Sequence, residues 1–194
     1  MRLSILIPTI IDRTEQFNAL STFFHNQIDL FDLNDQVEII SLLDNKELSI
    51  GKKRQHLYEM ARGEYSVMWD DDDGAAHNSL PLIMEALSTD PDCVTYKESC
   101  TIDGVHKTSN HSNKYIDWGE NFDGFDYVRT VFFKDVIRTS LCLQTGVADM
   151  RYAEDIDFAR RLKPLITTEV HIDEWIYFYQ HVSSNHNERY GIES

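Results

Sequence analysis

Four consecutive aspartates, Asp70 to Asp73, form the most prominent chemical feature of the sequence. They directly follow an apolar run, residues 65–69, that has the length of a buried strand. Ligands of open α/β sheets bind beyond the carboxyl ends of the strands, so the aspartates are expected at a binding edge. Adjacent carboxylates repel one another, and a hard divalent cation such as Mn²⁺ or Mg²⁺ relieves that repulsion. Such an ion would also neutralise the phosphates of a nucleotide diphosphate. The alternative interpretation is a solvated acidic loop or a helix cap before Ser79.

The spacing of apolar residues in the first half of the chain predicts the strands and helices that position the four aspartates. Apolar runs at 3–7, 37–43 and 65–69 predict strands, and residues 17–24 and 51–60 have helical spacing. Alternation of strands and helices indicates a parallel α/β sheet.

The second half predicts a mixed extension of the sheet. A hairpin is expected over residues 93–108, with Asp103-Gly104 as its turn. Residues 109–127 are polar and are expected to form a long functional loop. Further on, we expect a strand at 131–133, a helix at 155–162 and a strand at 176–179.

Several short motifs resemble the family 2 glycosyltransferases of the GT-A fold. Members commonly read G-x-x-R-N, then A-x-G-E-Y, an apolar strand and D-x-D-D. This chain has Gly51-Lys52-Lys53-Arg54, then Ala61-Arg62-Gly63-Glu64-Tyr65 and the four aspartates, in that order. The first strand with Pro8-Thr9, the second strand with Asp44, and Glu154-Asp155 at the start of a helix also resemble the family. The similarity covers roughly positions 3–80 and 128–182.

The resemblance implies a GT-A-type α/β domain with a mixed, mostly parallel sheet flanked by helices, and a role for each matching residue. The nucleotide-sugar donor would contact Pro8, Thr9, Asp44, Arg54, Asp70 and Asp71; the metal ion would contact Asp72, Asp73 and His181; and Asp155 would be the catalytic base, with Glu154 as the second candidate.

Asp155 also suits the chemistry of inverting sugar transfer, in which a base takes the proton of the acceptor hydroxyl. Its alternative role is an ordinary helix cap. For His181 the alternative is a surface histidine without a ligand role. The family pattern is not complete, because Leu43, Asn45-Lys46 and Gln55 replace commonly found residues beside the second strand and in the helix after it. These departures bear on base recognition rather than on the reaction class.

Composition narrows the class of protein. The 194 residues contain no linker or repeat, so we expect a single domain over 1–194. A formal net charge of −15 argues against duplex nucleic acid as a partner. Three cysteines without metal-like spacing indicate a reduced, cytoplasmic setting, and no apolar run reaches membrane-spanning length.

The sequence therefore predicts a metal-dependent, inverting glycosyltransferase that uses a nucleotide diphosphate sugar, with UDP favoured, and a saccharide or other hydroxyl acceptor. The polar tail after His181 is expected to order over the diphosphate when the donor binds. A nucleotidyltransferase is one alternative, although residues 10–14 supply one basic residue and no glycine for a phosphate loop. A non-catalytic acidic module that binds Ca²⁺ or a partner protein is the other.

Overall fold

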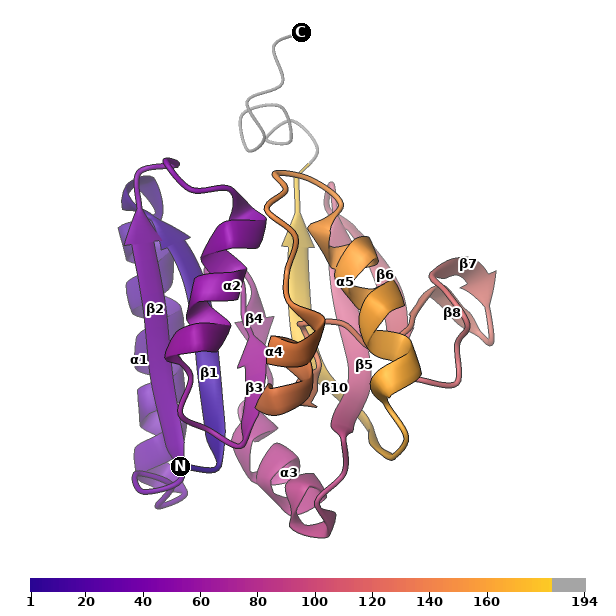
Figure 1. The fold of residues 1–194 in the computed structure, drawn as a ribbon, viewed down its shortest axis with the longest axis horizontal. Helices are drawn as coiled ribbons and strands as arrows, with labels where there is room; N and C mark the ends of the chain where they lie inside the picture. The colour runs from indigo at the N-terminus through magenta and orange to yellow at the C-terminus, as the bar shows by residue number, and fades with distance from the viewer. Residues whose placement is uncertain (183–194) are drawn as a thin grey trace, which may run out of the picture.

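The structure, a computed structural model, describes residues 1–182. A mixed sheet runs through the molecule, with helices on both of its faces (Figure 1). Its helices and strands are β1 (Leu3–Ile10), α1 (Thr14–Leu30), β2 (Val37–Asp44), α2 (Ile50–Met60), β3 (Tyr65–Met68), β4 (Gly74–Ala75), α3 (Ser79–Ala86), β5 (Cys93–Ile102), β6 (Val105–His111), β7 (Gly119–Phe122), β8 (Phe125–Arg129), β9 (Val136–Arg138), α4 (Thr139–Thr145), α5 (Glu154–Leu162) and β10 (Glu169–His181).

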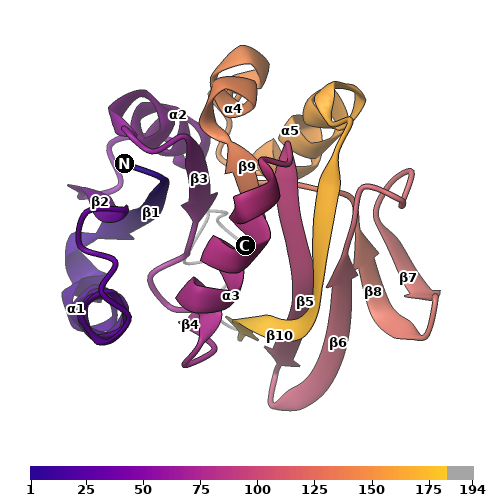
Figure 2. The ribbon, with the colours of Figure 1, turned by 90° about the horizontal axis from the view of Figure 1, so that it is seen from below.

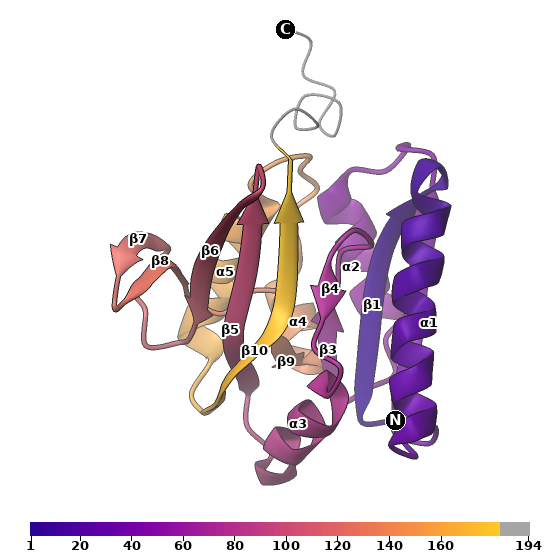
Figure 3. The same cartoon turned by 180° about the vertical axis from the view of Figure 1, so that it is seen from behind.

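The first half of the chain forms the parallel part of the sheet, in the order β2-β1-β3. Helix α1 connects β1 to β2, which pairs with one edge of β1. Helix α2 connects β2 to β3, which pairs with the other edge of β1. Seen from behind, α1 lies in front of the sheet at its β1–β2 edge, whereas α2 lies on the opposite face (Figure 3). The order of the strands reverses here, so β1 marks a topological switch point, where α/β sheets bind ligands.

Helices on both faces explain why β1 is apolar without a break. Ile5 and Ile7 belong to the core cluster beneath α1 and α3, while Leu6 belongs to the cluster beneath α2, α4 and α5. Figure 2 shows these two groups of helices on opposite sides of the strands. Strands buried on both faces read as continuous hydrophobic runs. The predicted fold class, an α/β domain with a mixed sheet between helices, is confirmed.

The second half extends the sheet around β5. β6 pairs with β5 in an antiparallel hairpin, and β10 runs parallel along the length of β5. The expected hairpin turn is confirmed, since Asp103 and Gly104 both have positive φ, at 49° and 80°. None of the helices within residues 1–182 is long and apolar enough to cross a membrane.

Two expectations for the second half are wrong. Residues 131–133 form a buried turn rather than a strand, because Asp135 closes it: the Phe132 amide donates to Asp135 Oδ2 (3.0 Å), and the Asp135 amide donates to the Phe132 carbonyl (2.9 Å). The strand comes afterwards, as β9. The long loop expected at 109–127 instead contains the end of β6, all of β7 and the start of β8, which project at the far edge of the sheet (Figure 1). Helix α4 was not predicted.

Candidate active site

A pocket of about 380 Å³ lies at the carboxyl ends of β1, β2 and β3. Its walls are formed by the last residues of β1, the segments that follow β1, β2 and β3, the first turns of α2 and one residue of the loop before α5. Its lining consists of Pro8, Thr9, Ile10, Asp12, Arg13, Lys46, Leu48, Ile50, Lys53, Arg54, Asp70, Asp71, Asp72 and Arg151. The pocket therefore lies at the switch point, where the sequence places the predicted donor site.

The charge of the lining differs from that of the whole protein. Five side chains of the lining are basic and four are acidic, so basic groups are concentrated here relative to the chain as a whole, which has a formal net charge of −15. The basic residues are Arg13, Lys46, Lys53, Arg54 and Arg151. A local excess of basic groups in a concave site attracts anions.

Two arginines offset the repulsion within the aspartate run. Arg13 donates to Asp71 Oδ1 (2.7 Å) and lies 3.4 Å from Asp72 Oδ1, while Arg54 donates to Asp70 Oδ1 (3.0 Å). Thr9 adds a hydroxyl hydrogen bond to Asp71 Oδ2 (2.8 Å). Three of the four carboxylates thus line the pocket with cationic neighbours already in place. A metal ion is therefore not the only charge that makes this run tolerable.

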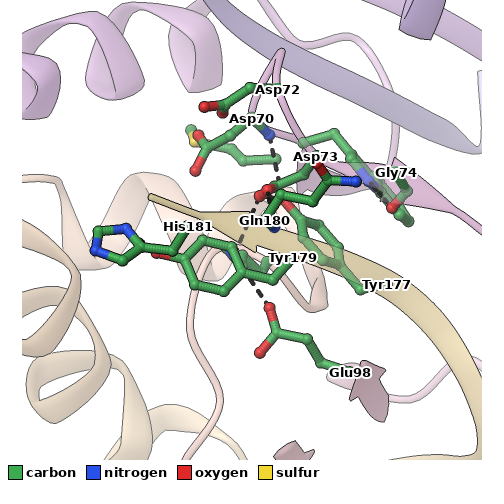
Figure 4. Close-up of polar contacts among 12 residues, drawn as sticks. Asp70, Asp72, Asp73, Gly74, Glu98, Tyr177, Tyr179, Gln180 and His181 are labelled. Carbon is green, nitrogen blue, oxygen red and sulfur yellow. Dashed lines mark hydrogen bonds and ion pairs between the residues drawn. The ribbon is translucent and has the colours of Figure 1, made fainter. Parts of the chain in front are cut away.

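Asp73 is not part of the pocket lining and points toward residues of β10, on the other side of the turn from Asp70 and Asp72 (Figure 4). Its carboxylate accepts hydrogen bonds from the Tyr177 hydroxyl (2.6 Å) and the Gln180 amide (3.0 Å), and Lys134 Nζ lies 3.3 Å away. Burial raises the pKa of Asp73 to about 6, against the lowering effect of Lys134. Because both oxygens are engaged inside the protein, the predicted role of Asp73 as a metal contact finds no support in this geometry.

Arg54 joins the aspartate run to the start of α5. Its guanidinium is buried, 3.8 Å above the ring of Phe133, and its Nε lies 3.4 Å from Glu154 Oε1. Burial raises the pKa of Glu154, and the charge of Arg54 partly offsets that rise. The predicted donor residue Arg54 and the predicted catalytic residue Glu154 are thus in direct contact.

Asp155, the predicted base, is the next residue of α5 and is half-buried. Its Oδ1 accepts the amide hydrogen of Ile156 (2.8 Å). It is not part of the pocket lining, but its charge acts on Arg54. Asp155 thus lies near Arg54, outside the pocket lining.

Asp44 lies behind the pocket wall rather than in it. Burial would raise the pKa of Asp44, but the hydrogen bonds from Lys53 and from the Leu48 amide outweigh burial and lower it. Lys53 also donates to the carbonyl oxygen of Thr9 (2.7 Å) and so ties the ends of β1 and β2 together. The carboxylate of Asp44 is therefore already engaged by Lys53 and by the Leu48 amide.

His181 ends β10, with its Nδ1 3.3 Å from the Tyr179 hydroxyl. Among residues 1–182, no three His, Cys, Asp or Glu side chains are arranged to hold a metal ion, so Asp72, Asp73 and His181 are not assembled as a ligand set. The tail expected to close over the diphosphate lies outside the described residues.

Sequence reasoning missed several residues of the pocket. Arg13, Lys46, Lys53 and Arg151 line it, together with the apolar Ile10, Leu48 and Ile50. A search for basic residues just after each predicted strand would have found Arg13 and Lys46. Gln55, which replaces the usual asparagine, accepts the Val147 amide (2.8 Å) and so has a structural contact outside the lining.

Comparison with solved structures supports the fold assignment. No protein-family model matches the chain, and no similar curated protein was found. The crystal structure of S. aureus TarS 1–349 in complex with UDP-GlcNAc matches with a TM-score of 0.66 at 15% identity, over 93% of this chain and 58% of that chain. TarS 1–349 in complex with UDP matches with a TM-score of 0.65 at 13% identity, over 97% and 63%.

A more distant likeness is to the bifunctional IspDF from Campylobacter jejuni, with a TM-score of 0.51 at 10% identity, over 90% of this chain and 50% of that chain. The chain spans less than two thirds of the length of these structures. At such low identities the likeness concerns the fold, and it supports the GT-A-like architecture that the sequence motifs predict.

Proposed function

We propose that this chain is an inverting glycosyltransferase that moves a sugar from a nucleotide diphosphate sugar, with UDP as the nucleotide, onto a hydroxyl of a saccharide or other acceptor. The observation that carries the proposal is the pocket at the switch point. It combines a basic lining for a diphosphate, apolar side chains for a base and a row of aspartates, and Arg54 connects it to the acids of α5. The TarS structures with the same fold contain UDP-GlcNAc and UDP, which favours UDP as the nucleotide.

A divalent cation, Mn²⁺ or Mg²⁺, fits this site. Asp70 and Asp72 supply oxygen ligands at the pocket wall, with His181 as a third proposed ligand. Such ions are commonly held by one or two carboxylates together with substrate phosphates, so a complete ligand set from protein alone is not needed. When bound, the ion would neutralise the charge of the diphosphate.

The catalytic step assigned to this chain is removal of a proton. Asp155 takes the proton of the acceptor hydroxyl as that oxygen attacks the anomeric carbon, and the diphosphate leaves on the opposite face. Glu154 is buried and forms an ion pair with Arg54. Of the two adjacent acids, Asp155 is therefore the one proposed to reach an acceptor.

The test is incubation of the purified protein with a panel of nucleotide sugars, candidate acceptors and Mn²⁺, with EDTA as the control. Release of nucleoside diphosphate with a product of inverted anomeric configuration is expected. Release of pyrophosphate would instead indicate nucleotidyl transfer, and retained configuration would exclude the inverting mechanism. Binding without turnover across the acceptor panel would favour the non-catalytic module.

The role of Asp155 is tested by Asp155→Asn, with Glu154→Gln as the matched control. Asp155→Asn is expected to bind UDP like the wild type and to lower turnover by roughly a hundredfold or more. If Asp155→Asn stays active while Glu154→Gln does not, the base is Glu154.

A further inference from the structure

A row of buried charged side chains runs from the aspartate turn into the sheet. Asp73 Oδ2 lies 3.3 Å from Lys134 Nζ, which lies 3.1 Å from Glu98 Oε1. Glu98 Oε2 lies 3.2 Å from His111 Nε2, and His111 Nδ1 lies 3.0 Å from Asp135 Oδ1. All five side chains are buried, and they come from the turn after β3, from β5, from β6 and from the turn before β9.

Lys134 is the cation nearest the active-site end of this row. Its ammonium lies 3.8 Å from the ring centroid of Tyr179 and 4.3 Å from that of Tyr177, both on β10. Burial lowers the pKa of Lys134, but Asp73 and Glu98 outweigh burial and keep that pKa above its ordinary value. Lys134 is therefore charged in the folded protein and contacts both β10 and the aspartate turn.

The turn and β10 are also joined by hydrogen bonds around Asp73. The Tyr177 hydroxyl donates to Asp73 Oδ2 (2.6 Å) and accepts the amide hydrogen of Asp70 (3.2 Å). The amide of Gln180, the residue before His181, donates to Asp73 Oδ1 (3.0 Å). Figure 4 shows Asp73 among these partners, whereas Asp70 and Asp72 point to the other side of the turn.

We propose that Lys134, acting through Asp73, is a positioning residue of the donor site: it fixes the aspartate turn 70–73 against the end of β10, so that Asp70 and Asp72 face the pocket where the diphosphate of the donor would bind. The donor part of this inference rests on the proposed function. Asp73 is then the structural anchor of the aspartate run, and Asp70 and Asp72 are its outward-facing members.

A role in positioning explains why such a costly arrangement is present. Buried ion pairs contribute little net stability compared with apolar residues of similar volume, because desolvation offsets the attraction between the charges. Here a misplaced partner would leave a buried charge unpaired, so the proposed role of the pairs is to favour one arrangement of the segments that they join. Here the joined segments are the two that carry the predicted metal ligands.

The experiment compares Lys134→Met with the double variant Asp73→Asn/Lys134→Met. The single variant removes the cation that pairs with both Asp73 and Glu98, so these buried carboxyl groups lose their counter-charge, and the Tm is expected to fall by roughly 10 °C. The double variant removes one positive and one negative charge, so the row keeps its net charge and most of the Tm is expected to return. Lys97→Met is the matched control, because Lys97 lies on β5 with its ion pair to the exposed Asp173.

Two measurements decide the proposal. The affinity for UDP with Mn²⁺ is expected to fall by roughly tenfold or more in both Lys134 variants and to be unchanged in Lys97→Met. Hydrogen exchange is expected to be faster than in the wild type in peptides covering 70–76 and 174–182 of the double variant.

If UDP affinity returns together with the Tm in the double variant, Lys134 has only a structural role and the proposal is overturned. If the wild type itself does not bind UDP with Mn²⁺, the proposed function fails instead, and hydrogen exchange alone decides. Unchanged exchange in those two peptides then overturns the positioning role, and faster exchange supports it.

Discussion

Replacing Arg54 with methionine tests the connection between the aspartate run and α5. The side chain of Arg54 is 6% exposed and lies 3.0 Å from Asp70 and 3.4 Å from Glu154, whose side chains are 26% and 8% exposed. Methionine is an unbranched apolar side chain, so it removes the charge and its contact with the ring of Phe133 but fills part of the same space. Glu154 is then left as a buried carboxylate without a cation.

The expected loss of stability is about 3–5 kcal/mol at neutral pH, since removal of one partner of a buried ion pair typically has this effect. For a chain of this size that corresponds to a fall in Tm of roughly 10 °C. Burial already raises the pKa of Glu154, and loss of Arg54 raises it further. A carboxyl group with a raised pKa in the folded state contributes stability at low pH that is lost as the pH rises through that pKa. The loss of unfolding free energy in Arg54→Met is therefore expected to be larger at pH 8 than at pH 5.

The assay is urea unfolding followed by tryptophan fluorescence at pH 5 and pH 8. Arg161→Met is the control, because the ion pair of Arg161 with Asp157 is exposed and is worth at most about 1 kcal/mol. A loss below about 1 kcal/mol in Arg54→Met, or an equal loss at the two pH values, would refute the electrostatic reasoning.

Three further predictions concern the core, the motif glycine and the metal. Burial lowers the pKa of His111, but Asp135 and Glu98 outweigh burial and raise that pKa to about 9. The free energy of unfolding is therefore expected to fall by up to about 3 kcal/mol between pH 6.5 and 9, as His111 loses its proton. Urea unfolding across this range checks it, and a constant or rising stability contradicts it. Gly51→Ala is expected to lower the free energy of unfolding by about 1–3 kcal/mol and to displace the loop before α5. The reason is that a Cβ at Gly51 would lie 1.9 Å from the carbonyl oxygen of Ala148. An unchanged Tm would contradict this prediction. Asp72→Asn is expected to weaken Mn²⁺-dependent UDP binding by roughly tenfold in calorimetry, with Asp173→Asn as an exposed control. Unchanged Mn²⁺ dependence in Asp72→Asn would remove Asp72 from the metal site.

Local patterns predicted the frame of the fold and the edge of the sheet at which the pocket lies. The continuous apolar run of β1, the helical spacing of α2 and the aspartates after β3 are each encoded within a few residues. Parallel strands then bring their carboxyl ends to one edge, so Thr9, Arg54 and Asp70 meet in one pocket as expected. The motif glycine Gly51 was recognised only as a pattern, and its reason became clear once the loop at Ala148 lay against it.

Only the tertiary structure decided which way each carboxylate points. Asp72 and Asp73 are adjacent and chemically identical in the sequence, yet Asp72 lines the pocket while Asp73 is turned inward by Lys134 and Gln180. Those partners lie 61 and 107 positions further along the chain, beyond the reach of any local pattern. The turn at 131–133 was missed for a related reason, since Asp135 replaces strand pairing with its own side-chain hydrogen bond. Periodicity records burial and local conformation, whereas the partner of a buried charge is chosen when distant segments pack together.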